Sequence, residues 1–221
     1  MTDTTEPRPL SLADLRRNYT RTGLDEAAAD VDPIVQCGRW LREAVEAGVP
    51  EPNAMTLATA TPDGLPAART VLLKGLDERG FVFYTNYESQ KGHELAANPR
   101  AALVLYWAEL ERQVRVVGAV SMTTREETEH YFRSRPVGSQ LGAWVSRQSQ
   151  PVADRGVLEV RLRELEASFG DGPIAPPPFW GGYRVAAETV EFWQGRPDRL
   201  HDRLRYTRQS DGRWQIERLA P

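Results

Sequence analysis

Residues 191–203 read Glu191-Phe192-Trp193-Gln194-Gly195-Arg196-Pro197-Asp198-Arg199-Leu200-His201-Asp202-Arg203 and predict a strand, a tight turn and a second strand. Side chains two apart on a strand share a face, so Arg199, His201 and Arg203 are expected to project together. Such a cationic stripe is either a solvated strand face or part of a binding site. The ring of Trp193 on the partner strand favours a site for a flat, anionic ligand.

Alternating apolar residues indicate further strands on both sides of this segment. The pattern predicts strands at residues 55–61, 67–74, 81–85, 101–107, 113–122, 183–185, 189–194, 199–207 and 214–219. Turn residues such as Pro62-Asp63-Gly64 and Asp211-Gly212 keep the connections short, which implies antiparallel pairing. This many antiparallel strands predicts a sandwich or a barrel, and periodicity does not separate the two.

Capping residues predict helices between some of these strands. Asp32 followed by Pro33 begins a helix that ends near Gly48 and carries Cys37 on its apolar face, so the thiol is expected in the core. Other helices are predicted at residues 89–98, 124–133, 138–146 and 154–167, the second of them opened by a capping box. We therefore expect one α+β, mainly β, domain over residues 1–221, with a helical insertion at 124–168 and a disordered tail at 1–9.

Composition excludes several classes of protein. The net charge is −3, with 28 basic and 31 acidic residues, which argues against a general nucleic-acid binder. A single cysteine cannot form an intramolecular disulfide, and no apolar run is long enough to cross a membrane, so a cytoplasmic protein is expected. Glycine-rich phosphate loops, nucleophile elbows and metal-ligand spacings are absent, so no metal site is predicted.

Several motifs together identify a family that the chain resembles. It resembles the flavin mononucleotide (FMN)-dependent pyridoxine/pyridoxamine 5'-phosphate oxidases from about Leu15 to the last residue. Beside the segment quoted above, the matching blocks are Arg69-Thr70-Val71-Leu72-Leu73-Lys74, Phe83-Tyr84-Thr85-Asn86, Glu111-Arg112-Gln113-Val114, Ser134-Arg135-Pro136, Gly142-Ala143-Trp144-Val145-Ser146, Phe179-Trp180-Gly181-Gly182 and Arg218-Leu219-Ala220-Pro221. The resemblance implies an antiparallel split β-barrel and a homodimer with flavin bound across the subunit boundary.

The resemblance also assigns the residues that bind FMN. They are Arg69, Thr70, Val71, Leu72, Leu73, Lys74, Tyr84, Thr85, Gln90, Lys91, Gln113, Gln148, Ser149, Trp193 and Arg203. Gln90 stands where many relatives have a basic residue, which predicts a weaker contact to the flavin phosphate. Arg69 and Lys74 are five apart and face opposite sides of a regular strand, so joint action on one ligand needs a bulge or a ligand at the strand end.

On the substrate side, the resemblance assigns one group of residues to the phosphate and another to the pyridine ring. Lys74, Tyr131, Arg135 and Ser139 meet the phosphate, and Tyr131 and Arg135 are spaced to share a helix face. Arg199 and His201 meet the ring and act as the catalytic residues. Arg16, Arg17 and Tyr19 belong to a mobile segment, residues 10–22, that covers the substrate.

The implied reaction converts pyridoxine 5'-phosphate or pyridoxamine 5'-phosphate to pyridoxal 5'-phosphate. In the family, hydride passes from C4' of the substrate to N5 of FMN, and O2 then reoxidises the flavin to give H2O2. Ammonia is released from the amine substrate. Two alternatives stay open: another split-barrel flavin reductase, or a carrier that binds FMN or pyridoxal phosphate without turnover.

Overall fold

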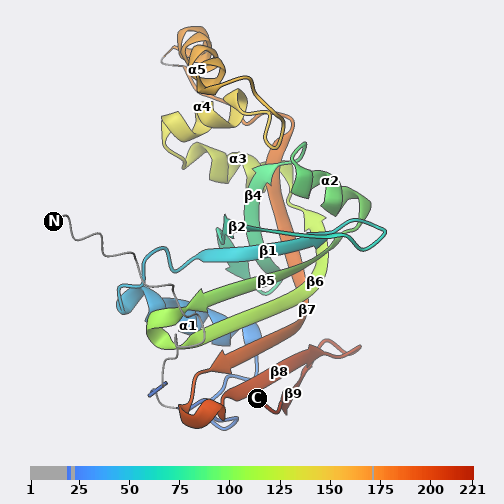
Figure 1. Cartoon of the computed structure of the whole chain (residues 1–221). Helices are drawn as coiled ribbons and strands as arrows, with labels where there is room; N and C mark the ends of the chain where they lie inside the picture. The colour runs from blue at the N-terminus through green and yellow to red at the C-terminus, as the bar shows by residue number, and fades with distance from the viewer. Residues whose placement is uncertain (1–18, 21–22, 171) are drawn as a thin grey trace, which may run out of the picture.

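The computed structural model describes residues 19–20, 23–170 and 172–221, and it folds the chain around one curled antiparallel sheet (Figure 1). The sheet order is β2-β1-β5-β6-β7-β4-β3, and β8 pairs with β7 and β9 with β8. Its strands are β1 Ala54–Ala60, β2 Pro66–Leu72, β3 Gly75–Asp77, β4 Gly80–Asn86, β5 Arg100–Trp107, β6 Arg112–Met122, β7 Trp180–Gln194, β8 Asp202–Arg208 and β9 Trp214–Arg218. The expected split β-barrel is confirmed, and so is the antiparallel pairing.

The long strand β7 joins the two ends of the molecule. Its first residues pair with β4 and its last with β8, while β6 pairs with it from Tyr183 to Gln194. The prediction of two separate strands at 183–185 and 189–194 was therefore wrong, because both segments belong to β7. The ladder with β6 continues across residues 186–188 because β7 accommodates one extra residue, Glu188, in a bulge opposite Val117 and Gly118. A Cβ on Gly118 would lie 1.9 Å from the Ala186 carbonyl oxygen.

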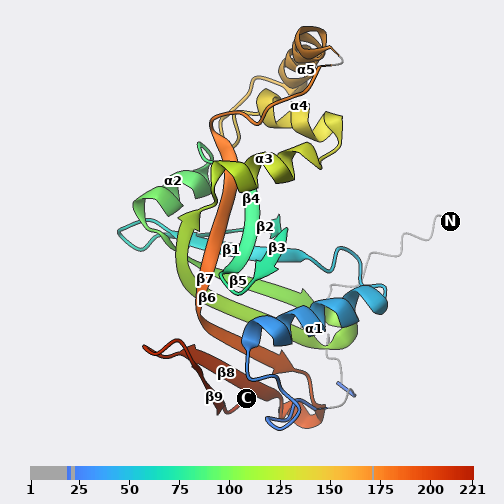
Figure 2. The same ribbon diagram turned by 180° about the vertical axis from the view of Figure 1, so that it is seen from behind.

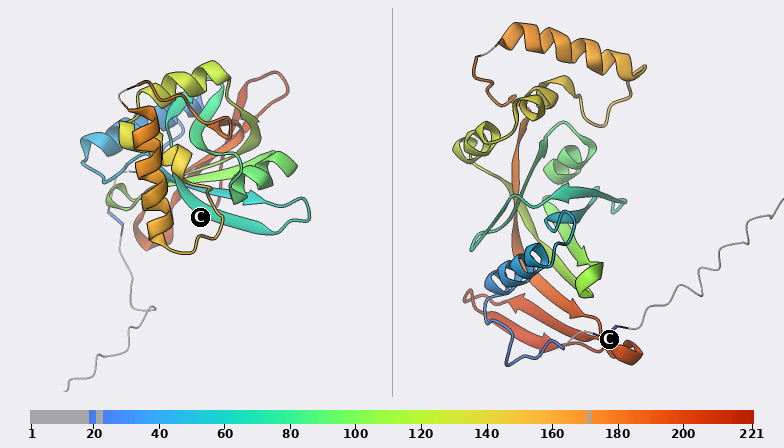
Figure 3. Two further views of the ribbon diagram at one scale, coloured as in Figure 1. Left: turned by 90° about the horizontal axis from the view of Figure 1, so that it is seen from above. Right: turned by 90° about the vertical axis from the view of Figure 1, so that its left-hand side faces the viewer.

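Three of the five described α-helices lie together at one end of this sheet. The helices are α1 Pro33–Glu46, α2 Gln90–Ala97, α3 Arg125–Arg133, α4 Val137–Val145 and α5 Arg155–Phe169. Helices α3, α4 and α5 gather beyond the Trp180 end of β7, and β8 and β9 lie at its other end (Figure 1; Figure 3, right). At about 3.3 Å per residue, Trp180 and Trp193 stand roughly 40 Å apart along this strand.

The core forms where α1 crosses the sheet (Figure 2). Asp32 caps α1 through the Ile34 amide, as its sequence predicts. Cys37 is fully buried, and burial raises the pKa of its thiol to about 12, which confirms a core residue rather than a nucleophile. None of the described helices has the length and hydropathy that a membrane span requires.

The turn after β7 differs from the prediction. A 3-10 helix, Pro197–Arg199, follows β7, and β8 begins only at Asp202. Asp198 and Arg199 have φ values of 55° and 61°, a left-handed conformation that breaks strand alternation. The expectation that Arg199, His201 and Arg203 share one strand face was therefore wrong, because only Arg203 lies on a strand.

Candidate functional site

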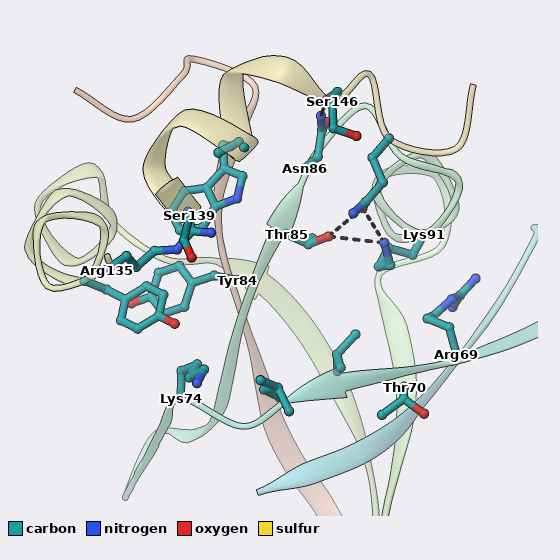
Figure 4. Close-up of a pocket in the computed structure, with 17 residues that line it drawn as sticks. Arg69, Thr70, Lys74, Tyr84, Thr85, Asn86, Lys91, Arg135, Ser139 and Ser146 are labelled. Carbon is teal, nitrogen blue, oxygen red and sulfur yellow. Dashed lines mark hydrogen bonds between the residues drawn. The ribbon is translucent and has the colours of Figure 1, made fainter. Parts of the chain in front are cut away.

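A cavity of about 500 Å³ opens between β2, β4, α2 and the helices α3 and α4 (Figure 4). It brings together residues from four separate parts of the sequence. The predicted site residues that line it are Arg69, Thr70, Val71, Leu72, Lys74, Tyr84, Thr85, Lys91, Tyr131, Arg135, Ser139 and Gln148. Flavin-assigned and phosphate-assigned residues thus share one cavity.

The end of β2 explains how Arg69 and Lys74 reach the same cavity. β2 ends at Leu72, and the Lys74 amide donates to the Val82 carbonyl oxygen at 2.8 Å as the chain turns into β3. Because Lys74 lies beyond the strand, its side chain is not bound by strand alternation. The sequence left two ways for Arg69 and Lys74 to act on one ligand, a bulge or a position at the strand end. The structure agrees with the second. Leu73, between them, is buried in the core instead of lining the cavity.

Lys91 forms a cationic subsite at one side of the cavity. Its buried ammonium donates to Gln148 Oε1 at 2.7 Å and to the hydroxyls of Thr85 and Ser89 at 3.2 Å each. No carboxylate within the described ranges forms an ion pair with it. Burial, and then the neighbouring Arg69, lowers the pKa of Lys91 to about 8. A buried cation that meets only neutral acceptors indicates an anionic ligand.

Arg69 stands beside this ammonium and is held by a buried carboxylate. Its Nη2 lies 3.0 Å from Glu94 Oε2, and its Nη1 donates to the Thr59 hydroxyl. Gln90 donates to the other oxygen of Glu94 at 2.8 Å and does not line the cavity. Gln90 therefore supports Arg69 indirectly in this structure.

Arg135 forms a second cationic subsite, among aromatic rings. Its guanidinium lies 4.7 Å from the Trp180 ring centre, and its Nη1 is buried with no hydrogen-bond partner among the described residues. Tyr131 stacks on Tyr84 with ring centres 4.0 Å apart. Arg135 lies two residues past the end of α3, so the predicted shared helix face was wrong, yet both side chains line the cavity. In Figure 4, Arg135, Ser139 and Lys74 lie apart from Arg69 and Lys91.

Other predicted residues form a row at the far end of β7. Gln113, Trp193 and Arg203 are directly opposite one another on β6, β7 and β8, so their side chains share a face. Arg203 is held by Glu191, with Nε and Oε1 2.9 Å apart, and it donates from Nη1 to the Ala220 carbonyl oxygen at 2.8 Å.

His201 and Tyr19 flank this row. Tyr19 packs edge-on against both Trp193 and His201, and it approaches Gly195 so closely that a Cβ there would lie 2.7 Å from its ring. The Arg196 amide donates to His201 Nδ1 at 3.1 Å, which leaves Nε2 to carry the proton of the neutral imidazole. Burial and then Arg199 lower the pKa of His201, so the neutral form prevails at pH 7.

Some predicted residues do not line the cavity, and some cavity residues were not predicted. Ser149 follows Gln148 without lining the cavity, and Arg16 and Arg17 lie outside the described residues. Cavity residues that were not assigned are Asn86, Gly142, Ala143, Ser146 and Trp180. Each belongs to a motif block quoted above, so membership of a block was the signal that pointed to them. Among the described residues, no group of three or more His, Cys, Asp or Glu is placed to hold a metal ion.

Comparison with known proteins gives matches over nearly the whole chain. Residues 41–169 match the family described as pyridoxamine 5'-phosphate oxidase, and residues 180–221 match the pyridoxine 5'-phosphate oxidase C-terminal dimerisation region. A pyridoxine/pyridoxamine 5'-phosphate oxidase of Rubrobacter xylanophilus is 64% identical over 95% of this chain and 96% of its own length. One of Burkholderia vietnamiensis is 57% identical over 96% and 99%.

Solved structures show the same fold. PhzG from Burkholderia lata, in complex with tetrahydrophenazine-1-carboxylic acid, superposes with a TM-score of 0.86 and 33% identity, covering 93% of this chain and all of its own. An FMN-binding protein related to pyridoxamine 5'-phosphate oxidase from Nostoc punctiforme has a TM-score of 0.70 at 19% identity, covering 87% of this chain and all of its own, which supports the fold alone.

Proposed function

The chain belongs to the pyridoxine/pyridoxamine 5'-phosphate oxidase family, and from that premise we propose that it oxidises pyridoxine 5'-phosphate or pyridoxamine 5'-phosphate to pyridoxal 5'-phosphate with FMN as cofactor. The observation that carries the proposal is the pair of cationic subsites in one cavity, at Lys91 and at Arg135, with aromatic side chains beside the second. Two phosphorylated, flat ligands match this arrangement.

The donor set at Lys91 fits the phosphate of FMN. Lys91 and Arg69 supply positive charge, and the hydroxyl of Thr85 and the amide of Gln148 supply neutral hydrogen-bonding groups. When bound, FMN would supply the redox chemistry, accepting hydride from the substrate and passing its electrons to O2. The tasks of this chain are then to orient two rings and to exclude water.

The Arg135 subsite suits the phosphate ester of the substrate. Its unpartnered Nη1, the Lys74 ammonium and the hydroxyls of Tyr131 and Ser139 are donors at one side of the cavity. Trp180 beneath the guanidinium limits its movement. A phosphate held there would anchor the pyridine ring that carries the reacting carbon.

The site is proposed to be completed by a second copy of the chain. Trp180, at the first residue of β7, lines the cavity, whereas Trp193, at the other end of β7, and His201 and Arg203 beyond it do not. We infer a homodimer in which the cavity of one copy meets the Trp193 end of its partner, which agrees with the C-terminal match to a dimerisation region. A flavin-binding monomer in light scattering would exclude this assembly.

Substrate turnover tests the proposed function directly. The purified protein is expected to be yellow, to release FMN on denaturation, and to produce H2O2 with pyridoxine 5'-phosphate and with pyridoxamine 5'-phosphate. A carrier would bind these ligands without peroxide, and a flavin reductase would oxidise a nicotinamide cofactor instead. Tetrahydrophenazine-1-carboxylic acid is the comparison substrate, because it is bound in the PhzG structure and has no phosphate. Turnover of that acid alone would replace our proposal.

The charge of Lys91 predicts how FMN affinity depends on pH. The phosphate is a dianion above about pH 7, and it favours the protonated amine, so binding raises the pKa of Lys91 from about 8. Affinity is therefore expected to be highest between about pH 7 and pH 8 and to fall as pH rises above 8. Fluorescence titration with FMN between pH 6.5 and 9.5 measures the slope of FMN affinity against pH. Lys91→Met should bind about one to two decades more weakly, with little slope. An equal slope in both proteins would place the titrating group elsewhere.

A further inference from the structure

Four charged side chains form a closed network one helical turn from Tyr131. Arg184 on β7 contacts Asp77 on β3 (Nη1 to Oδ1, 2.6 Å) and Glu127 on α3 (Nη2 to Oε1, 2.9 Å). Arg79 bridges the same two carboxylates at 2.8 and 2.9 Å. None of the four lines the cavity described above. We propose that Arg184 is a positioning residue that holds the two walls of the substrate-phosphate subsite in register, an inference that rests on the proposed function.

Burial singles out Arg184 within the network. The Arg184 side chain is 11% exposed, whereas that of Arg79 is 56% exposed. The ion pairs of Arg79 therefore lie at the surface and add little to the stability of the fold. Burying a guanidinium costs desolvation energy that its ion pairs only partly return, so its net gain in stability is small. What the planar fork does provide is geometry, because two carboxylates on different elements are held at fixed positions.

The first arm of the network, the ion pair between Arg184 and Glu127, sets the position of α3. One Glu127 oxygen meets Arg184, and the other accepts from the Thr124 amide in the capping box, so the first turn of the helix is tied to β7. Tyr131 lies four residues after Glu127, on the same face of α3. Arg135 follows the end of that helix. A shift of α3 against β7 would move both phosphate ligands together.

The second arm sets the position of Lys74. Val82 on β4 is directly opposite Arg184 on β7, and the Lys74 amide donates to the Val82 carbonyl oxygen. Lys74 precedes β3, and Asp77, at the far end of that short strand, takes the other half of the Arg184 fork. Lys74 therefore reaches the subsite from one side and Tyr131 with Arg135 from the other, and Arg184 joins the two supports.

Three substitutions separate this role from general stability. Glu127→Gln keeps an oxygen for the Thr124 amide but loses the charge that meets Arg184. Asp77→Asn weakens the second arm, the ion pair between Asp77 and Arg184. Arg184→Met removes both ion pairs. Each is expected to raise KM for pyridoxine 5'-phosphate about tenfold or more, because small misplacements of binding groups are costly. KM for unphosphorylated pyridoxine, kcat at saturation and FMN affinity should change less than about threefold. Arg184→Lys keeps the charge without the fork and should lie between wild type and Arg184→Met.

A matched control removes an ion pair from the same strand without touching α3. Arg100→Met breaks a pair with Glu188 on β7, and wild-type KM is expected for it. Wild-type KM for the phosphate ester in folded Glu127→Gln and Asp77→Asn would overturn the inference. Equal losses for phosphorylated and unphosphorylated substrates would also overturn it. If the wild type oxidises neither ester, the proposed function fails. The network is then judged by equilibrium dialysis with pyridoxal 5'-phosphate, where unchanged binding in the variants rejects it.

Discussion

Arg199→Ala is expected to purify yellow and yet to slow the reduction of bound FMN by pyridoxine 5'-phosphate about a hundredfold, because hydride transfer requires the substrate ring to be held in register. Two consecutive residues in left-handed backbone, Asp198 and Arg199, mark this turn as a conformation that the surrounding structure must enforce. His201→Ala should fail in the same step, since Nε2 is its available donor. Anaerobic stopped-flow reduction measures both rates.

Arg203→Ala provides the contrast, because its side chain lies in the row with Gln113 and Trp193. We expect it to lose flavin, with affinity lower by about one to two decades. If the three cationic and imidazole groups were only a solvated surface, all three variants would retain colour and turnover. Wild-type rates of flavin reduction in Arg199→Ala and His201→Ala would make us withdraw their catalytic assignment.

Activity should return when two inactive variants share one dimer. Arg135 lines the cavity and Arg199 lies beyond the other end of β7, so in the proposed dimer each complete site draws them from different copies. A dimer of one Arg135→Ala chain and one Arg199→Ala chain has one site with both defects and one with neither. Such heterodimers, isolated with two affinity tags, should show about half the wild-type turnover, as expected for a symmetric dimer with independent sites.

The control for this experiment pairs variants from the same end. A heterodimer of Arg135→Ala and Lys74→Ala carries one defect in each site, because both residues line the cavity. It should stay as inactive as its parents. Equal activity in the two kinds of heterodimer, or no recovery in the first, would contradict a site shared between copies.

Local sequence was sufficient for most individual elements of this fold. The caps of α1 and α3, the turn between β1 and β2, and the burial of Cys37 depend on neighbours a few residues away, so the pattern along the chain predicts them. Most cavity residues lie in the ordered motif blocks, and the family resemblance assigned the other four, Lys91, Tyr131, Ser139 and Gln148. Periodicity alone would have assigned Arg69 and Lys74 to opposite faces of a strand.

Contacts between distant residues decided the rest. Whether β7 continues past Ala186 depends on its ladder with β6, and the place where β8 begins depends on the left-handed backbone at Asp198 and Arg199. A strand of fifteen residues then separates residues that the motif blocks had assigned to one site. Local patterns carry no information on distance in space, because hydrogen-bonded pairing, not spacing in sequence, sets which side chains meet. The sequence by itself thus determined the type of most elements and the chemistry of their side chains, and only the tertiary structure decided which of these side chains line one cavity and which lie at the other end of β7.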